Sequence, residues 1–304
     1  VEFGVNLNNR EPLIAPGYGM PQLLDLSEVV EGHGFDSVWV GDSLFSKPRY
    51  EAIALLSALS QRTKQVRLGT ACLVSSPRNP LYLALEWATL DVLSNGRTIF
   101  GCCAGNPEVG VRREFEALGL PPFEARGKVT DEYIAAFKEL WTNDRPRFAG
   151  EFVKFDKITF APKPPQKGGI PIWVGGESGP ALRRTAKYGD AWYPIPNNPA
   201  FPMDSLKRLE AAIGKLRKMT QEAGRDPKSV GVTIRFPRYG TGVLEKAGDG
   251  ERRLFSGSAA DIAADVKAMA ALGVGCIDTG FGGSTVPEIL DEMRKFRDDV
   301  MARV

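Results

Sequence analysis

The sequence predicts a single α/β domain, a (β/α)8 barrel over residues 1–304. Short apolar runs of strand length alternate with segments of helical periodicity, and eight strands are matched by about eight helices. This alternation is typical of a parallel sheet, because a parallel connection needs a crossover of helix length. A chain of 304 residues, 43% of them hydrophobic, is long enough for eight such units to close into a barrel.

Each expected strand is a short apolar run that a turn signal ends. The eight runs are residues 3–7, 37–40, 66–73, 98–102, 172–174, 191–193, 230–236 and 276–279. Apolar positions at helical spacing predict the helices between them. These are residues 21–31, 51–62, 80–93, 128–141, a helix that begins at Ser178, 203–223, 258–271 and 286–301, with a short extra helix at 111–118.

Turn residues indicate where several of the expected helices and strands begin or end. Gly32 and Gly34 stop the first helix, and Asn95-Gly96 forms the turn into the fourth strand. Residues 147–160 alternate with period two around a glycine, which predicts a small antiparallel hairpin appended to the main repeat. No separate domain boundary is expected.

Composition indicates a soluble globular protein without affinity for nucleic acid. Lys and Arg number 39 against 37 Asp and Glu, so the net charge of +2 provides no basic field. No apolar run approaches the roughly 20 residues of a membrane span, and the first residues form an expected strand instead of a signal peptide. We therefore expect a cytoplasmic protein with no nucleic-acid and no membrane partner.

The four cysteines lack the spacing of a zinc or redox site. Cys72, Cys102, Cys103 and Cys276 each lie in or just after an expected strand, without a CxxC motif. We expect reduced thiols, and the adjacent Cys102 and Cys103 should point to opposite faces of their strand. Either one of them lines a pocket, or both are small buried packing residues.

In a barrel of this kind, chemistry is expected in the loops that follow the C-terminal ends of the strands. The only histidine, His33, comes before the second strand and therefore at the opposite end. This position argues against a histidine triad or a histidine metal site. Asp42 and Glu108 are the only plausible acidic pair in the loops, which favours chemistry by a bound cofactor over hydrolysis.

A strand, a glycine turn and a helix follow one another within residues 170–194. Gly175 and Gly176 allow backbone N–H groups to approach a ligand closely, and Ser178 is a good N-cap for the helix. Because a helix N-terminus attracts anions, this turn is a candidate phosphate site. A tight turn without a ligand is the alternative.

Five motifs, in this order, resemble the bacterial-luciferase-like flavin-dependent oxidoreductases, or luciferase-like monooxygenases. The motifs are FGVNLNN, GFDSVWVGDSLF, VRLGTACLV with RNPLYLALEWATLDVLSNGR, REFEALGLPPFEARGKVTDEYIAAFKELW and PIWVGGESGPALRRTAKYGDAWYP. The resemblance covers nearly the whole chain. It implies a (β/α)8 barrel with insertions after strand 4 and around strand 7, often dimeric through helices two and three. It also implies a cofactor at the C-terminal mouth, either reduced FMN or the 8-hydroxy-5-deazaflavin coenzyme F420.

The resemblance also implies roles for single residues. The cofactor phosphate would be held by Gly175, Gly176, Glu177 and Ser178, and Ala71-Cys72 falls where members often have a non-proline cis peptide. The residues implied around the ring or the substrate are Asn6, Asp42, Cys103, Gly105 and Asn106. Cys103 matches a cysteine that luciferases carry close to the ring. Arg78 is either a ligand contact or a solvated loop arginine.

Three positions depart from the resembled proteins. Deazaflavin-dependent sugar-phosphate dehydrogenases have an Asp-His pair after strand two and a glutamate after strand four, where this chain has Asp42-Ser43 and Asn106. These two departures argue against sugar-phosphate activity. Luciferases have a phosphate-binding arginine where Ala104 stands. The residue that would bind the cofactor phosphate in place of this arginine is therefore undecided, and Arg112 and Arg183 are the candidates.

The cofactor choice depends on two sets of side chains near strand ends. Aromatic residues there could keep water from an oxygen-reacting site, or could only pack the core. They are Phe45, Tyr50, Trp192 and Tyr193. Basic residues could instead bind the oligoglutamate tail of a deazaflavin. They are Lys47, Arg49, Arg235 and Arg238.

The favoured hypothesis is a two-component monooxygenase, a homodimer that takes reduced FMN from a separate flavin reductase and oxidises a small organic substrate with O2. Its expected catalytic residues are Asp42, Ser43, Cys103 and Asn106, and its expected substrate contacts are Phe45, Arg78 and Tyr193. Hydride transfer with coenzyme F420 is the enzymatic alternative, and a flavin-carrying barrel without turnover is the non-enzymatic one. No general base is assigned, because Ser43 is a poor base without help.

Overall fold

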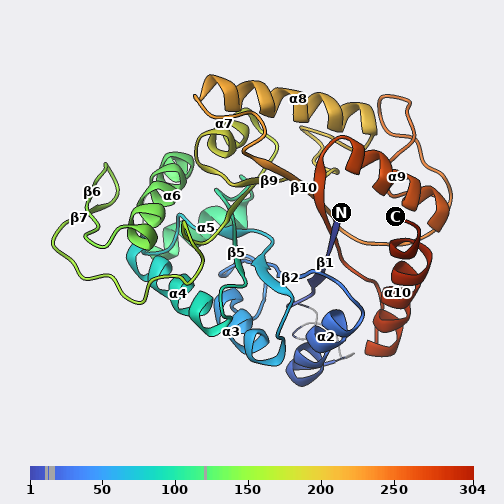
Figure 1. The fold of residues 1–304 in the computed structure, drawn as a ribbon, viewed down its shortest axis with the longest axis horizontal. Helices are drawn as coiled ribbons and strands as arrows, with labels where there is room; N and C mark the ends of the chain where they lie inside the picture. The colour runs from blue at the N-terminus through green and yellow to red at the C-terminus, as the bar shows by residue number, and fades with distance from the viewer. Residues whose placement is uncertain (11–12, 14–17, 120–121) are drawn as a thin grey trace.

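The computed structural model describes residues 1–10, 13, 18–119 and 122–304, so residues 120 and 121 of the fourth quoted motif lie outside it. Within these ranges eight strand positions form a closed parallel barrel surrounded by helices (Figure 1). The strands are β1 (Glu2–Leu7), β2 (Ser37–Val40), β3 (Arg67–Thr70) with its continuation β4 (Leu73–Val74), β5 (Thr98–Cys103), β8 (Ile172–Gly175), β9 (Ala191–Tyr193), β10 (Gly231–Phe236) and β11 (Val274–Thr279). Neighbours follow the order β3-β2-β1-β11-β10-β9-β8-β5, and β3 pairs with β5 to close the ring. The predicted fold class is confirmed.

The expected strand 66–73 is divided in the structure. β3 pairs with β2 and with the start of β5, whereas β4 pairs with the end of β5. Between them the Ala71-Cys72 peptide bond is cis. The prediction of one continuous strand is therefore wrong, and the cis bond implied by the family resemblance is present.

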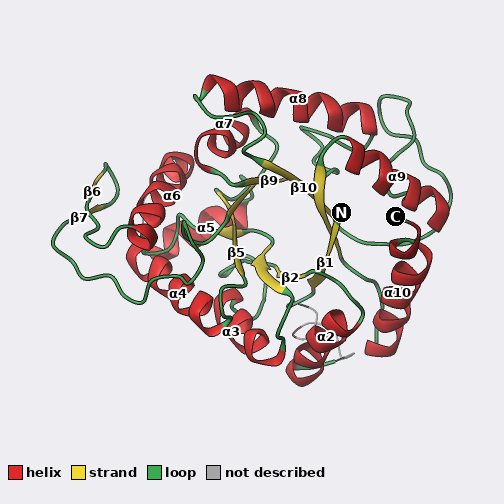
Figure 2. Ribbon diagram, viewed as in Figure 1, coloured by secondary structure: helices red, strands yellow, loops and turns green. Residues whose placement is uncertain are grey.

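Helices cover the outside of the barrel (Figure 2). They are α2 (Met20–Gly32), α3 (Ala52–Arg62), α4 (Pro80–Leu93), α5 (Val109–Leu118), α6 (Arg126–Thr142), α7 (Gly179–Tyr188), α8 (Leu206–Glu222), α9 (Ala259–Ala271) and α10 (Val286–Asp299), with 3-10 turns η1 (Phe123–Ala125) and η2 (Met301–Arg303). α8 begins three residues later than predicted, because Ser205 is its N-cap and accepts a hydrogen bond from the Arg208 N–H at 3.2 Å. His33 is the C-cap of α2, at the end of the barrel away from the candidate loops, as expected.

Two insertions extend the barrel. β6 (Phe148–Ala149) and β7 (Lys154–Phe155) form the predicted antiparallel hairpin, which projects from the outer side of α6 in Figure 1. Between β10 and α9 a long loop is closed by an antiparallel bridge from Lys246 to Arg252. These are the insertions that the resemblance implies after strand 4 and around strand 7.

The barrel interior is filled by aromatic side chains. Trp39, Trp173 and Tyr193 pack with ring centroids 4.9–5.8 Å apart, and all three are buried. Gly69 provides the space for this aromatic floor, because a Cβ there would stand 2.3 Å from the Trp39 ring. Gly4 does the same on β1, where a Cβ would lie 2.5 Å from Trp39 Nε1. The interior below the strand ends is therefore closed.

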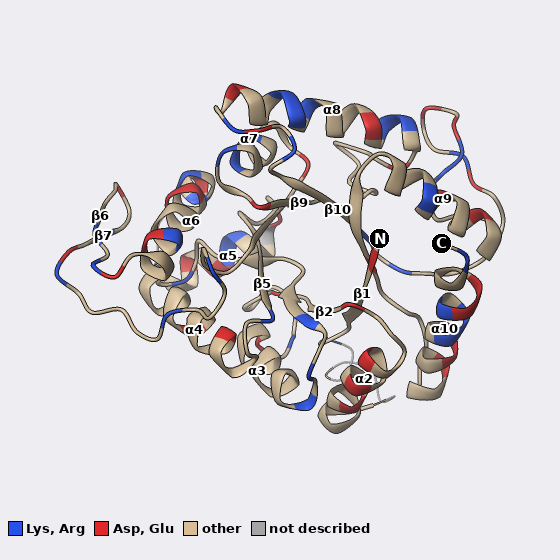
Figure 3. Cartoon of the chain, viewed as in Figure 1, with Lys and Arg blue, Asp and Glu red and all other residues tan. Residues whose placement is uncertain are grey.

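Charge is distributed over the outer helices without a large field of one sign. Figure 3 shows Lys and Arg interspersed with Asp and Glu along α8 and α10. In the part of the chain that the structure describes, no helix combines the length and the apolar character required to cross a bilayer. The same residues contain no cluster of three or more His, Cys, Asp or Glu side chains that could hold a metal ion.

Candidate active site

Side chains of successive strand residues alternate between the helices and the barrel axis, and this alternation defines the mouth. On β11, Ile277 packs in the outer core whereas Cys276 belongs to the interior cluster. On β9, Trp192 packs outside and Tyr193 inside. The inward residues at or just beyond the C-terminal strand ends are Asn6, Cys72, Cys103, Gly175, Tyr193, Arg235 and Asp278. Trp192, expected as a possible shield, faces the helices instead and donates its indole N–H to the Gly176 carbonyl at 2.9 Å.

Arg235 connects opposite sides of the mouth. Its Nη1 donates to the carbonyl oxygen of Ala71 at 2.7 Å, although the two residues are 164 positions apart. The next side chain, Cys72, lies against Gly175, where a Cβ would stand only 2.4 Å from its sulfur. Gly175 is therefore required at the end of β8 to admit this thiol. Arg235 therefore reaches across the mouth, with its side chain 26% exposed.

Asp278 is a buried carboxylate that the sequence analysis missed. Its exposed fraction is 1%, and burial raises its pKa to about 7. The nearest cation is Arg235, whose Nε lies 3.8 Å from Oδ2. Two signals could have identified it: its position two residues after Cys276 on one face of a strand, and its place at the C-terminal strand end.

Asp42 is held by a bidentate ion pair. Arg78 donates Nη1 to Oδ2 at 2.9 Å and Nη2 to Oδ1 at 2.8 Å, and the Val74 N–H donates to Oδ2 at 2.9 Å. Arg78 also donates to the Val74 carbonyl at 2.7 Å. The sequence predicted both residues for the site, and the structure joins them in one contact that holds β4 to the loop after β2.

The thiols of Cys72 and Cys103 are neighbours in the mouth. The Cys72 thiol donates toward the Cys103 sulfur, which raises the pKa of Cys72 and lowers the pKa of Cys103. Cys102 points outward into the core against the helices, as expected for adjacent strand residues. The described cysteines are all free thiols.

The turn from β8 into α7 is shaped for an anion. Gly176 has φ of +111°, a conformation that favours glycine, and Ser178 caps α7 by accepting the Ala181 N–H at 3.4 Å. The Nη1 of Arg183 lies 3.5 Å from the point where a Cβ on Gly179 would stand, so this guanidinium folds back over the first turn of α7. Arg112, the other candidate, pairs with Glu124 at 2.5 Å. Arg183 is therefore the better-placed cation.

Glu177 lies in this turn but directs its carboxylate elsewhere. It accepts the Ile195 N–H at 2.9 Å and the Asn198 side-chain amide at 2.6 Å, and burial raises its pKa. The side chain thereby connects the β8–α7 turn with the loop after β9. Only its backbone N–H remains suited to an anion.

Other predicted site residues lie at the rim. The Ser43 hydroxyl accepts the Lys47 N–H at 2.9 Å, and Asn106 donates to Glu108 at 2.7 Å. Gly105 has φ of +80°, and its carbonyl accepts from Arg126 at 3.2 Å. The Phe45 side chain is 68% exposed. These contacts place the four residues on the loops around the mouth, without joining them into one catalytic group.

The loop that bears Phe45 is anchored from α5. The Glu114 carboxylate, 2% exposed, accepts the backbone N–H of Phe45 at 2.7 Å and of Ser46 at 2.6 Å. Gly110 on the same helix lies against Ser46, where a Cβ would approach the serine Cβ to 2.8 Å. The segment after strand 4 therefore determines the position of the loop after strand 2.

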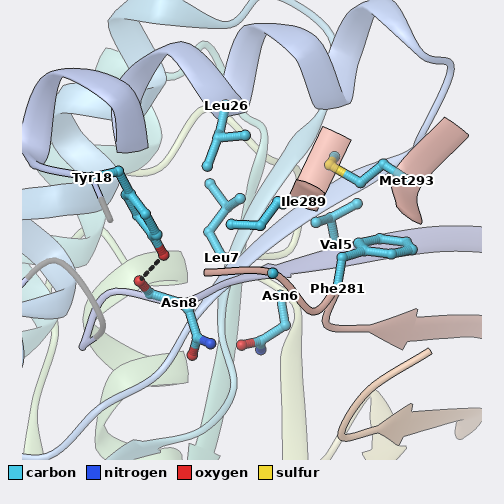
Figure 4. A pocket seen from close by; sticks show the side chains of 10 residues that line it. Val5, Asn6, Leu7, Asn8, Tyr18, Leu26, Phe281, Ile289 and Met293 are labelled. Atoms are coloured by element: carbon cyan, nitrogen blue, oxygen red, sulfur yellow. Dashed lines mark hydrogen bonds between the residues drawn. The ribbon is translucent and has the colours of Figure 1, made fainter. Parts of the chain in front are cut away.

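A small cavity of about 30 Å³ lies beside the mouth, outside the barrel wall. Figure 4 shows Val5 and Leu7 on the side of β1 that faces α2 and α10, whereas Asn6 points to the other side. The cavity has room for about one water molecule. It is thus no substrate site, and Asn6 serves the barrel interior.

Comparison with known proteins assigns the family. The description "Luciferase-like monooxygenase" matches residues 1–266. The chain belongs to this family. An F420-dependent glucose-6-phosphate dehydrogenase of Amycolatopsis mediterranei is 33% identical over 59% of this chain and 54% of its own length. An FMNH(2)-dependent dimethylsulfone monooxygenase of Pseudomonas putida is 26% identical over 74% of this chain and 56% of its own length. This luciferase-like chain therefore spans little more than half the length of either relative.

The structural comparison agrees on the fold. The monooxygenase RslO1 from Streptomyces bottropensis superposes with a TM-score of 0.78 over 99% of both chains, at 19% identity. At that identity the likeness shows the barrel architecture alone. The named relatives of this luciferase-like protein use either F420 or FMNH(2), so both cofactors are represented among them.

Proposed function

We propose that this chain transfers hydride between the deazaflavin coenzyme F420 and a small organic substrate. The observation that supports a coenzyme of this kind most directly is the pairing, at one mouth, of an anion cradle at the start of α7 with a set of buried polar side chains inside the barrel. Deazaflavin and FMN alike have a phosphate at one end and a tricyclic ring at the other. The cradle fits the phosphate, and the polar side chains lie where the ring would meet its reaction partner.

The phosphate end would be held by the β8–α7 turn. Backbone N–H groups at Gly176 and Glu177, the start of α7 and the guanidinium of Arg183 lie within one helical turn. The ring end would lie at the mouth beside Ala71-Cys72 and Gly105, as the family resemblance implies, which leaves the buried polar side chains of Asn6, Tyr193 and Asp278 for the bound substrate. The bound coenzyme would supply hydride chemistry at this place.

The choice of F420 rests on similarity and on what the aromatic residues do. The F420-dependent relative has the higher identity of the two, at 33% against 26%. Of the four aromatic residues considered as a shield against water, Trp192 faces the helices and Phe45 is mostly exposed. The argument for an oxygen-reacting pocket is thereby weaker. Glucose 6-phosphate is not the proposed substrate, because Ser43 and Asn106 replace the residues that such dehydrogenases carry.

The second candidate is the monooxygenase that the sequence analysis favoured, with reduced FMN from a separate reductase and O2. The FMNH(2)-dependent relative, which is 26% identical and aligns with 74% of this chain, supports it. Both candidates use the same mouth and the same phosphate cradle. They differ in whether O2 is consumed.

A homodimer is proposed for either candidate. Helix α4 exposes Tyr82 by 69%, Val92 by 48% and Leu93 by 47%, and α4 packs beside α3. Large apolar side chains at the surface of adjoining helices are typical of an interface. Sedimentation of the purified protein tests this expectation, and a monomer at micromolar concentration would contradict it.

The test of function is an anaerobic titration of the protein with reduced F420 and, in parallel, with reduced FMN. Tryptophan fluorescence reports the binding of each coenzyme. We expect tighter binding of F420 and no oxygen consumption. Tighter FMN binding with reductase-coupled O2 uptake would replace this proposal with the second candidate. Failure to bind either would overturn both, and tight binding without turnover on any substrate panel would leave a non-catalytic barrel.

A matched pair of variants tests the phosphate cradle. Arg183→Met removes the guanidinium over the first turn of α7, and loss of one charged hydrogen bond should weaken binding by roughly 10- to 100-fold in Kd. Lys187→Met, one turn further along the same exposed face, should leave Kd unchanged. Equal effects of the two substitutions would show a general charge effect instead of a phosphate site.

A further inference from the structure

The Asp278 carboxylate lies next to the aromatic floor. A Cβ on Gly4 would stand 2.9 Å from the Asp278 Cβ and 2.5 Å from Trp39 Nε1, so Asp278 and Trp39 both lie against Gly4. The side chain comes from β11, between β1 and β10 in the ring.

Polar atoms from four adjacent strands converge here, and none of them has a hydrogen bond of good geometry. Asn6 Nδ2 on β1, Tyr193 Oη on β9, Arg235 Nε on β10 and both carboxylate oxygens of Asp278 on β11 are buried without a hydrogen bond of good geometry to a described residue, and the Tyr193 phenol and the Asn6 amide both face the Asp278 carboxylate. Unpaired buried polar atoms of this number are costly, and in native proteins a ligand or water commonly satisfies them. Asp278 and Tyr193 are both more than nine-tenths buried.

The charge of Asp278 is only weakly compensated. Arg235 directs Nη1 to the Ala71 carbonyl at 2.7 Å and leaves Nε at 3.8 Å from Oδ2 of Asp278. The Asp42–Arg78 pair at the rim is bidentate, with both contacts below 3 Å. Asp42 is therefore fixed in a structural ion pair, whereas Asp278 lies beside its cation without a close contact.

We propose that Asp278 is the acid–base residue of this mouth, and that Tyr193 and Asn6 orient the bound substrate oxygen toward its carboxylate. The proposal rests on the proposed function and specifies its substrate as a hydroxyl compound or the corresponding carbonyl. In the oxidation direction, the C–H bond of the substrate breaks with its electron pair, which leaves as hydride to the coenzyme. The O–H proton passes to the Asp278 carboxylate, and the C=O bond forms. Reduction returns the same proton from Asp278 to the oxygen.

The surroundings of Asp278 explain why its protonation responds near neutrality. Burial disfavours the charged form, and Arg235 from β10 opposes this effect. The other groups that face the cluster are the Tyr193 phenol from β9, Asn6 from β1, the Cys72 thiol from the third strand and Cys276 on its own strand. The tyrosine and cysteine groups are neutral in this range, because burial raises the pKa of Tyr193 and of Cys276. A group with a pKa close to the operating pH is suited to proton transfer in both directions.

The first experiment needs no coenzyme. Carbon-13 NMR of protein labelled at aspartate carboxyl groups should show one resonance that titrates with a midpoint near 7 and is absent from Asp278→Asn. A resonance that remains ionised down to pH 5 would overturn the proposal. This readout is independent of whether F420 or FMN binds.

The second experiment uses the loaded protein and candidate alcohols. Asp278→Asn should lower the rate of hydride transfer by roughly 100- to 10,000-fold, and Asp278→Glu should restore part of it with a shifted pH profile. Asp265→Asn is the matched control, since Asp265 is also buried with its pKa raised to about 6, but pairs with Arg252 outside the barrel. Its pH profile should equal that of the unmodified protein.

The outcomes separate the inference from the function on which it rests. Hydride transfer at full rate and with an unchanged pH profile in Asp278→Asn would overturn the role of Asp278 and leave the function intact. Absence of any coenzyme binding would overturn the function, while the NMR titration would still report on Asp278. If Asp278→Asn does not fold, Tyr193→Phe should still raise KM for the alcohol more than it changes binding of the coenzyme.

Discussion

The ion pair between Asp42 and Arg78 allows a sharp test of whether Asp42 is a structural or a chemical group. The side chains are 3% and 11% exposed, and two hydrogen bonds of 2.8 and 2.9 Å join them. Removal of one partner from a buried pair leaves an uncompensated charge, which typically costs about 3–5 kcal/mol. We therefore expect Arg78→Met to lower the free energy of unfolding by this amount.

The reverse substitution should cost less. Asp42→Asn keeps an oxygen for the Val74 N–H, and Arg78 keeps the Val74 carbonyl and the Glu51 carboxylate at 3.7 Å. Loss of charged hydrogen bonds then costs on the order of 2 kcal/mol. Because the two side chains contact each other, the double variant should be more stable than the sum of the single effects predicts.

Urea unfolding at pH 7, with the slope m held constant, measures these differences. Arg62→Met is the control: its pair with Asp25 and Glu28 is exposed, and its removal should leave the midpoint almost unchanged. A loss below about 1 kcal/mol for Arg78→Met would refute the structural role of the pair. Unchanged stability with abolished coenzyme binding in Asp42→Asn would restore Asp42 as a chemical group.

Three further predictions concern the floor, the loop anchor and pH. Gly69→Ala should destabilise by roughly 1–3 kcal/mol in urea, because its Cβ would overlap the Trp39 ring, whereas Gly214→Ala, with open space around it in α8, should stabilise slightly. Glu114→Ala should raise amide hydrogen exchange in the loop after β2 and cost roughly 1–3 kcal/mol; unchanged exchange there would contradict the anchor. The native state holds the Asp278 proton up to about pH 7, whereas the unfolded chain releases it near pH 3.8. The free energy of unfolding should therefore fall as the pH rises from 3.8 to 7, by on the order of 4 kcal/mol relative to Asp278→Asn.

The barrel could be predicted from sequence because its signals are local and repeated. Each strand is an apolar run bounded by turn residues, and α4 was predicted with the bounds that the structure has, since Asn79 caps it and Pro80 starts it. The division of the third strand into β3 and β4 could not be predicted from such local signals. Nothing in the apolar run around Ala71 distinguishes a cis bond from a continuous strand, and only the family resemblance indicated it.

The site was predicted less completely, because its geometry depends on contacts between distant residues. Asp42 was identified, but its partner lies 36 positions away, and spacing in sequence does not reveal a bidentate pair. Asp278 was missed, since one acidic residue within a strand that is buried on both faces does not stand out. Trp192 and Tyr193 were treated alike, although neighbouring strand residues must point to opposite faces. The assignments of catalytic and binding roles stay predictions.

The aromatic floor has a consequence for the kinetics of the enzyme. With Trp39 and Trp173 packed in the interior, the barrel is a filled core, and reactants reach the site from its C-terminal side. Two reactants that stack at this mouth cannot bind in random order, since the upper one blocks passage of the lower. We therefore expect a compulsory order of addition and release, in which the reactant next to the floor enters first and leaves last, and an excess of the second reactant slows turnover by trapping the first.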